Sequence, residues 1–267
     1  MIARMLFLRR ILWPSVDPLM KPLVSLAVSL LPLALLAQPK PAAKDTPVIQ
    51  YPVPLVVTPA AKVKVTLRGQ KLEAVTEVKS ADAKVTAKLV GKGKKAGVPN
   101  NYPANKLGDT ECEVELEFAK DYSPESVALT AVAPAGSSEP YKLIAVAKPV
   151  AEKEPNDGFA QAQAVALPFA LEGVISKERD VDCFKFEGKK GQKVKFEVLA
   201  ARLGAPTDAL LTLYDDAKGV VAIADDSGES PDPILEAKLP RVGTYFLVVI
   251  ESSDLGGAQF GYRLKGE

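Results

Sequence analysis

Hydrophobic and polar residues alternate with a period of two in short runs along most of the chain after about residue 48. The clearest run is 111–118, where Cys112, Val114, Leu116 and Phe118 alternate with glutamates. Successive side chains of a strand point to opposite faces, so this run predicts a strand with one buried and one solvated face. Turn residues separate the runs, and the pattern therefore predicts an all-β protein.

In the first half, strands are expected over residues 54–58, 63–67, 75–78, 84–90, 111–118, 126–132 and 141–147. About seven strands at this spacing predict an immunoglobulin-like β-sandwich over residues 48–147. A long insertion, Gly91 to Asp109, separates two of these strands. Its lysines and Tyr102 either engage an acidic polymer or partner surface, or belong to a mobile, solvated loop.

The second half predicts a jelly-roll-like sandwich over residues 148–267, with strands at 170–175, 181–187, 193–199, 209–214, 220–224, 234–239, 243–249 and 260–264. A short Ala- and Gln-rich helix is expected over 157–165, ended by Pro168. Phe159 and Phe169 are expected to anchor the core. Because proline and small residues occupy the junction between the halves, we expect the halves to fold independently.

The N-terminus predicts export. Residues 23–37 are almost entirely apolar and follow Lys21, a length that suits a signal peptide better than a membrane span. We therefore expect residues 1–37 to be a signal peptide, with 1–19 either an extended positive region or a misassigned start, and residues 38–47 to be a flexible leader. A secreted or periplasmic location follows, with membrane contact only through the signal segment if it stays uncleaved as an anchor.

Composition excludes several functions. The 34 basic and 33 acidic residues nearly balance, which gives no indication of nucleic-acid binding. The chain has no histidine, which removes Ser-His-Asp and Cys-His catalysis and most catalytic zinc sites, so we expect no enzyme activity. The two cysteines, Cys112 and Cys183, fall in different halves. Since Cys112 lies on the inward face of its strand, we expect no disulfide.

An acidic string near the junction carries the candidate chemistry. Carboxylate and amide oxygens are the ligands that calcium prefers, and in an extended segment alternate residues point the same way. The predicted calcium ligands are Glu152, Glu154, Asn156, Asp157, Asp180 and Asp182. The alternative is a turn before the Ala-rich segment with solvated acids. The run from Asp225 to Asp232 is expected to be an acidic turn with a structural role for Asp232.

The second half resembles the bacterial pre-peptidase C-terminal domain, a β-sandwich related to the collagen-binding domains of clostridial collagenases. The resemblance rests on motifs in a specific order: Glu154-Pro155-Asn156-Asp157; Gly173, Asp180, Asp182 and Phe184; Gly191; Asp208; Leu213-Tyr214-Asp215 with Gly219; Asp225-Asp226; Asp232; Gly243-Thr244-Tyr245; and Gly261-Tyr262-Arg263-Leu264. It implies a secreted, non-catalytic module that accompanies proteases and other extracellular enzymes, with calcium ligands in the acidic linker and near Asp180 and Asp182.

Two further points concern family resemblance, one in each half of the chain. Collagen binding is not carried over, because aromatic residues make up 6% of the chain and Cys183 stands where many family members place a large aromatic residue. In the first half, residues 65–72 and 133–136 resemble the IPT/TIG group of immunoglobulin-like domains.

The predicted function is an exported, non-catalytic binding or adhesion module, stabilised by calcium, that recognises an extracellular protein or polysaccharide. Its cation would tie the linker to the first hairpin of the second sandwich. The alternative is an accessory or partner subunit of a secreted protease. A hydrolase using Asp225, Asp226 and Asp232 is the third and least favoured reading of the sequence.

Overall fold

The computed structural model describes residues 45–98, 102–147 and 150–267, which fall in one compact unit. The predicted signal peptide, residues 1–37, and most of the predicted leader lie outside the described residues. Within the described ranges, the structure contains no helix that is both long and apolar enough to cross a membrane. The protein is all-β, as the alternation of polar and apolar residues predicted.

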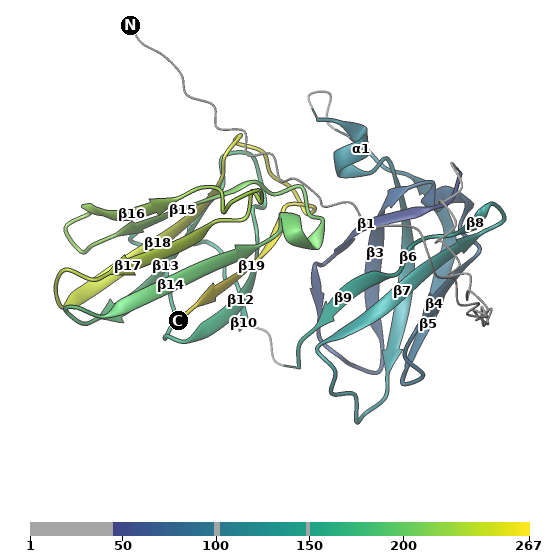
Figure 1. Ribbon diagram of the computed structural model, residues 1–267, viewed down its shortest axis with the longest axis horizontal. Helices are drawn as coiled ribbons and strands as arrows, with labels where there is room; N and C mark the ends of the chain where they lie inside the picture. The colour runs from purple at the N-terminus through teal and green to yellow at the C-terminus, as the bar shows by residue number, and fades with distance from the viewer. Residues whose placement is uncertain (1–44, 99–101, 148–149) are drawn as a thin grey trace, which may run out of the picture. The chain divides into compact units, whose positions relative to one another are not determined.

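The first sandwich contains β1 (Val48–Val53), β2 (Val56–Val57), β3 (Val63–Gln70), the 3-10 turn η1 (Leu72–Ala74), β4 (Glu77–Ser80), β5 (Val85–Lys95), α1 (Ala104–Leu107), β6 (Thr110–Phe118), β7 (Ser126–Ala133), β8 (Gly136–Ser137) and β9 (Tyr141–Ala145) (Figure 1). One sheet has the strand order β1-β3-β6-β5 and the other β2-β9-β7-β4, with β8 paired to β7. Side chains of both sheets, among them Leu67, Leu116, Leu129 and Leu143, fill one buried core.

The second sandwich contains β10 (Val150–Ala151), β11 (Gln163–Ala164), β12 (Phe169–Val174), β13 (Val181–Gly188), β14 (Lys193–Leu199), the 3-10 turn η2 (Ala201–Leu203), β15 (Ala209–Tyr214), β16 (Val220–Ala224), β17 (Ile234–Lys238), β18 (Gly243–Glu251) and β19 (Gly261–Gly266). Its two sheets have the orders β10-β12-β19-β14-β17 and β11-β13-β18-β15-β16. Buried side chains such as Phe184, Phe196, Tyr245 and Leu264 pack between them.

Contacts also join residues of the two sandwiches. Tyr51 and Leu107 of the first sandwich are fully buried and belong to the same apolar cluster as the core of the second. The Tyr141 hydroxyl donates to the Leu203 carbonyl at 2.6 Å, and the Tyr102 hydroxyl donates to the Pro206 carbonyl at 3.2 Å. Independent folding of the two halves stays a prediction.

The expected helix over 157–165 is wrong. Residues 157–161 form a bend and a turn, and Gln163–Ala164 pairs in parallel with β13 as strand β11. The side chain of Gln163 explains this, because it accepts from the Lys153 amide at 2.7 Å and donates to the Ala151 carbonyl at 3.2 Å. These contacts fix an extended backbone that an Ala-rich helix would break.

The expected loop from Gly91 to Asp109 is also partly wrong. Strand β5 continues to Lys95 through a register shift between Val90 and Lys94, and α1 follows. Gly91 has a φ of +74°, a conformation that glycine adopts at bulges without steric cost. Lys94 lies 3.2 Å from a carboxylate oxygen of Glu111 on the neighbouring strand. Residues 99–101 of this segment lie outside the described structure.

Phe159 does not anchor the core as expected. Its ring packs against Tyr214 and Phe246, and the Lys218 ammonium lies 5.7 Å from its centroid. Phe169, in contrast, packs against the core as expected.

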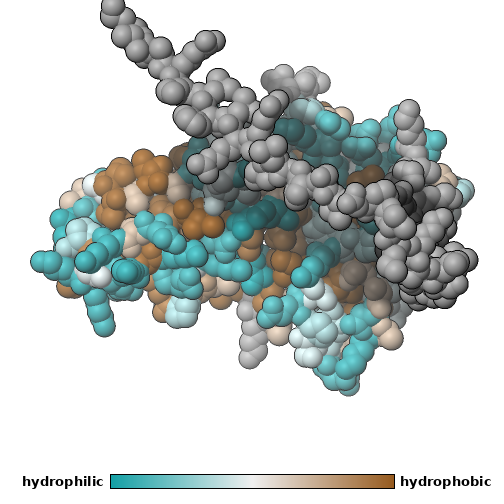
Figure 2. Space-filling model, in the orientation of Figure 1, coloured by the Kyte–Doolittle hydropathy of each residue, from teal (hydrophilic) through white to brown (hydrophobic). Residues whose placement is uncertain are grey.

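An apolar patch lies over β16, where Val220 and Ile223 are largely exposed (Figure 2).

Both cysteines are free and buried, which agrees with the expected absence of a disulfide.

Candidate metal centre

Backbone pairing brings the acidic linker beside the first hairpin of the second sandwich. β10 pairs in parallel with β12, and the Glu152 amide continues this pairing by donating to the Glu172 carbonyl at 2.9 Å. Further along, the Cys183 amide of β13 donates to the Asn156 carbonyl at 3.0 Å. The linker is therefore held against β12 at one end and β13 at the other.

Three of the predicted ligands converge. Glu152, Glu154 and Asp182 each offer a carboxylate oxygen, and these oxygens lie within 4.8 Å of one another. Asp182 is fully buried because it points from β13 to the inner face, on the same side as Phe184. Asn156 is also fully buried, and its side-chain amide donates to Glu152 Oε1 at 2.7 Å.

Hydrogen bonds occupy only part of this oxygen cluster. Glu152 Oε2 accepts from the Val174 amide at 2.9 Å, and Asp182 Oδ2 accepts from the Tyr262 hydroxyl at 2.7 Å. Asn156 Oδ1 and Asp182 Oδ1 are buried without any hydrogen-bond partner among the described residues. Buried polar atoms are normally satisfied, so two unpartnered oxygens in one acidic cluster fit the ligand set of an oxygen-bound cation.

Asp157 and Asp180 lie beside the cluster, with Lys177. The Lys177 ammonium is 3.0 Å from Asp157 Oδ1 and 3.3 Å from Asp180 Oδ1. Asp180 is almost fully buried, and its Oδ2 accepts from the Ser176 amide. Asp180 Oδ1 has no partner with hydrogen-bond geometry despite the nearby ammonium. Asp157 is exposed. The structure thus places these two carboxylates on a lysine, at the edge of the group formed by the other four residues.

The pKa values reflect crowded negative charge. Burial, together with the nearby Glu152 carboxylate, raises the pKa of Asp182 to about 10 against the opposing hydrogen bond from Tyr262. Burial also raises the pKa of Glu154. For Asp180, burial acts in the same direction, but the hydrogen bond from Ser176 and the ion pair with Lys177 outweigh it and lower the pKa. A cation would offset the repulsion that makes ionised Asp182 unfavourable.

The donor set fits calcium. Calcium takes six to eight oxygen ligands at about 2.3–2.6 Å and accepts carboxylates, amide carbonyls and water in flexible geometry. Glu152, Glu154, Asn156 and Asp182 supply such oxygens, and no histidine or thiolate is present to favour zinc.

Sequence reasoning missed Tyr262 and Lys177 as parts of this site. Gly173 lets the Tyr262 ring lie against its backbone, since a Cβ there would come within 2.3 Å of the ring. The Gly-Tyr-Arg-Leu motif marked Tyr262 for the fold, but only the pairing of β12 with β19, which sets Gly173 opposite Tyr262, reveals its contact with Asp182.

A second acidic group lies at the loop after β16. Oxygens of Asp208, Asp225 and Asp226 lie within 4.8 Å of one another, and Asp225 and Asp226 are exposed. Asp232 is separate and structural, as expected. It is fully buried and accepts from the amides of Ala200, Ala201 and Arg202 and from the Arg202 side chain.

Comparisons with known proteins agree with the sequence motifs. Residues 180–251 match the model of the bacterial pre-peptidase C-terminal domain. A probable subtilase-type serine protease of Deinococcus radiodurans is 38% identical over 104 residues, which cover 38% of this chain and 14% of the protease. The chain therefore spans a small part of that relative's length.

Two solved structures align with part of this chain. The pre-peptidase C-terminal domain of a Bacillus anthracis collagenase aligns with 40% of this chain and 94% of its own length, at 16% identity and a TM-score of 0.33. The secreted serine protease VesC of Vibrio cholerae aligns with 79% of this chain and 48% of its own, at 13% identity and a TM-score of 0.27. The resemblance of the first half to IPT/TIG domains stays a prediction. The match over residues 180–251 agrees with the resemblance to the bacterial pre-peptidase C-terminal domain that the motifs in the second half predicted.

Proposed function

We propose that the chain is an exported, non-catalytic binding module whose second sandwich is stabilised by calcium. The ion is held by Glu152, Glu154, Asn156 and Asp182, and Asp157 and Asp180 join it when Lys177 is displaced. The observation that carries the proposal is the pair of buried, unpartnered oxygens, Asn156 Oδ1 and Asp182 Oδ1, inside a cluster of carboxylates.

In this proposal the ion ties two segments of the chain together. Glu152 and Asn156 belong to the linker, whereas Asp182 belongs to β13, so one cation bonded to all three crosslinks the entry of the chain to the first hairpin. Without the cation, the raised pKa of Asp182 leaves its carboxyl protonated at neutral pH, and the crosslink between the linker and β13 is absent. A rigid junction reduces the ordering entropy lost when the module binds a partner.

Thermal unfolding in calcium and in chelator tests the site. Free calcium at 100 times the dissociation constant adds about 2.7 kcal/mol to the free energy of unfolding, so the wild-type melting temperature should rise. Asp182→Asn should abolish that rise, while its melting temperature in chelator stays close to that of the wild type, because the amide resembles the protonated carboxyl that a pKa of about 10 gives Asp182 without calcium. Asp225→Asn, in the other acidic group, is the matched control and should keep the full calcium response. An equal response in Asp182→Asn and wild type would contradict the proposed ligand set.

The partner of this module is proposed to be an extracellular protein or polysaccharide. A binding array of matrix proteins and glycans, probed with the calcium-loaded protein and again in chelator, tests this. Retention on a defined ligand that weakens in chelator supports the proposal. Binding to none of the probes in either condition contradicts it.

An accessory role beside a secreted protease is the second candidate. It is supported by the 38% identity over 104 residues to a segment of a probable subtilase-type serine protease. Chemical crosslinking of the exported protein in culture medium, followed by mass spectrometry, tests it. Crosslinks to a protease favour this candidate, whereas crosslinks confined to matrix proteins favour the first.

A further inference from the structure

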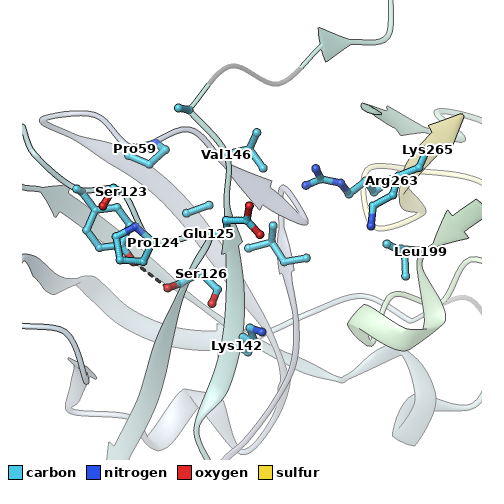
Figure 3. Close-up of a pocket in the computed structure, with 14 residues that line it drawn as sticks. Pro59, Ser123, Pro124, Glu125, Ser126, Lys142, Val146, Leu199, Arg263 and Lys265 are labelled. Atoms are coloured by element: carbon cyan, nitrogen blue, oxygen red, sulfur yellow. Dashed lines mark hydrogen bonds between the residues drawn. The ribbon is translucent and has the colours of Figure 1, made fainter. Parts of the chain in front are cut away.

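A cavity of about 390 Å³ within the described unit is lined by three basic side chains and one acidic one (Figure 3). The basic residues are Lys142 of β9 and Arg263 and Lys265 of β19, and the acid is Glu125. The remaining walls include the apolar side chains of Pro59, Ile144 and Leu199. The cavity therefore combines a surplus of positive charge with aliphatic surface.

Strand geometry explains the placement of two of these cations. Arg263 and Lys265 are two positions apart on β19, so both point to the outer face of their sheet, while Leu264 between them is fully buried. Leu199 is the register partner of Arg263 on β14, which brings an aliphatic side chain beside the guanidinium. The positions of the Arg263 and Lys265 charges are thus set by β19, the central strand of its sheet.

The guanidinium of Arg263 is incompletely paired. Its Nη1 lies 3.3 Å from Glu172 Oε1, and 13% of its side chain is exposed. Its Nε is buried and has no hydrogen-bond partner among the described residues. Figure 3 shows this guanidinium pointing toward Val146, a lining residue. Lys142 and Lys265 make no ion pair with any described residue. An anion in the cavity would therefore meet two ammonium groups that no described carboxylate pairs with.

The side chains that line the cavity favour one class of anion over others. The one aromatic lining residue in the described structure is Tyr122, which is 9% exposed and donates its hydroxyl to the Ser126 carbonyl at 2.8 Å. No ring is therefore available to stack on a sugar, whereas proline and aliphatic side chains suit an aliphatic body. Arginine pairs with the planar carboxylate in a fork geometry.

We propose that this cavity binds the C-terminal carboxylate of a peptide that ends in an aliphatic residue. Arg263 and Lys265 contact the carboxylate, Lys142 adds attraction from the opposite wall, and the last side chain packs on Ile144 and Leu199. Capture of a chain-terminal carboxylate is a known mode of peptide recognition. The site is separate from the acidic linker and requires no calcium. It gives the module a preference for protein ends of the kind that proteolysis creates.

Fluorescence anisotropy with a labelled Gly-Ser-Gly-Ala-Leu peptide tests the proposal on the full chain. The probe carries a free C-terminal carboxylate, and the comparison peptide is identical but amidated. Lys142→Gln combined with Lys265→Gln removes two exposed charges without opening the core. Lys190→Gln combined with Lys193→Gln is the matched control, since both are exposed lysines of the second sandwich outside the cavity.

The free-acid peptide should bind, and amidation should weaken binding by about tenfold or more, the loss expected when charge-assisted hydrogen bonds disappear. The Lys142/Lys265 double variant should show a similar loss, and the control double variant should bind as the wild type does. Equal binding of acid and amide, equal losses in the two double variants, or absence of binding at millimolar protein would each overturn the proposal. Binding of an oligouronate in place of the peptide would also overturn it, because the ligand would then be a saccharide.

Discussion

Glu172 gives the protein a pH-dependent stability that one substitution isolates. Its side chain lies on β12 and is 21% exposed, and Oε2 is buried without a hydrogen-bond partner. Burial raises the pKa of Glu172 from 4.5 to about 7, against the opposing attraction of Arg263 and Lys265. The folded state therefore holds the Glu172 proton more tightly than the unfolded state does. Its stabilising contribution is fully present below about pH 4.5 and is lost as the pH rises through about 7.

The size of the effect follows from the two pKa values. At 1.36 kcal/mol per pKa unit, the change from 4.5 to about 7 corresponds to about 3 kcal/mol as an upper limit. Glu172→Gln keeps the shape and removes the titration. We therefore expect the free energy of unfolding of the wild type, measured by urea denaturation, to fall relative to that of the variant as the pH rises from 4 to 8. Buried Asp182 remains in both proteins, so its titration cancels in the difference. A difference between wild type and Glu172→Gln that stays constant from pH 4.5 to 8 would refute this reasoning.

Three further predictions follow from buried groups. Asp232→Ala should lower the free energy of unfolding by about 3 kcal/mol in urea denaturation, because it strips a buried carboxylate from three amides and Arg202, whereas exposed Asp226→Ala should change it by about 0.5 kcal/mol or less. Tyr262→Phe should weaken calcium binding in titration calorimetry, since the hydroxyl that orients Asp182 is lost, and unchanged affinity would contradict that role. Alkylation without reductant should label neither Cys112 nor Cys183 in the native state and both after denaturation; a single labelled thiol or none after denaturation would contradict two free cysteines.

The strands were predictable because each buries one face. Along β6, Cys112, Val114 and Leu116 are buried and the intervening glutamates are not, as the alternation requires. The segment after Asn156 was not predictable in this way. Its alanines and glutamines favour a helix locally, yet the side-chain contacts of Gln163 and the parallel pairing with β13 are tertiary and override that preference. β1 was missed because its pattern is broken by a register shift and by Pro52.

The candidate site was predictable in its chemistry and less so in its arrangement. The sequence named the three carboxylates that converge, Glu152, Glu154 and Asp182. It did not separate the residues that converge from Asp157 and Asp180, which contact Lys177. That separation depends on Lys177 reaching across a turn. Likewise, Phe159 looked like a core anchor from its neighbours in sequence, but it packs on Tyr214 and Phe246 outside the core.

The most direct test of this account is titration calorimetry of calcium into the full chain after chelator treatment. We expect saturable binding in the wild type, loss of that binding in Glu152→Gln and in Asp182→Asn, and unchanged binding in Asp225→Asn. Failure of the wild type to bind calcium at millimolar concentration would contradict the account, as would full binding retained in Asp182→Asn. In either case the cluster of Glu152, Glu154 and Asp182 would be an acidic junction without a metal.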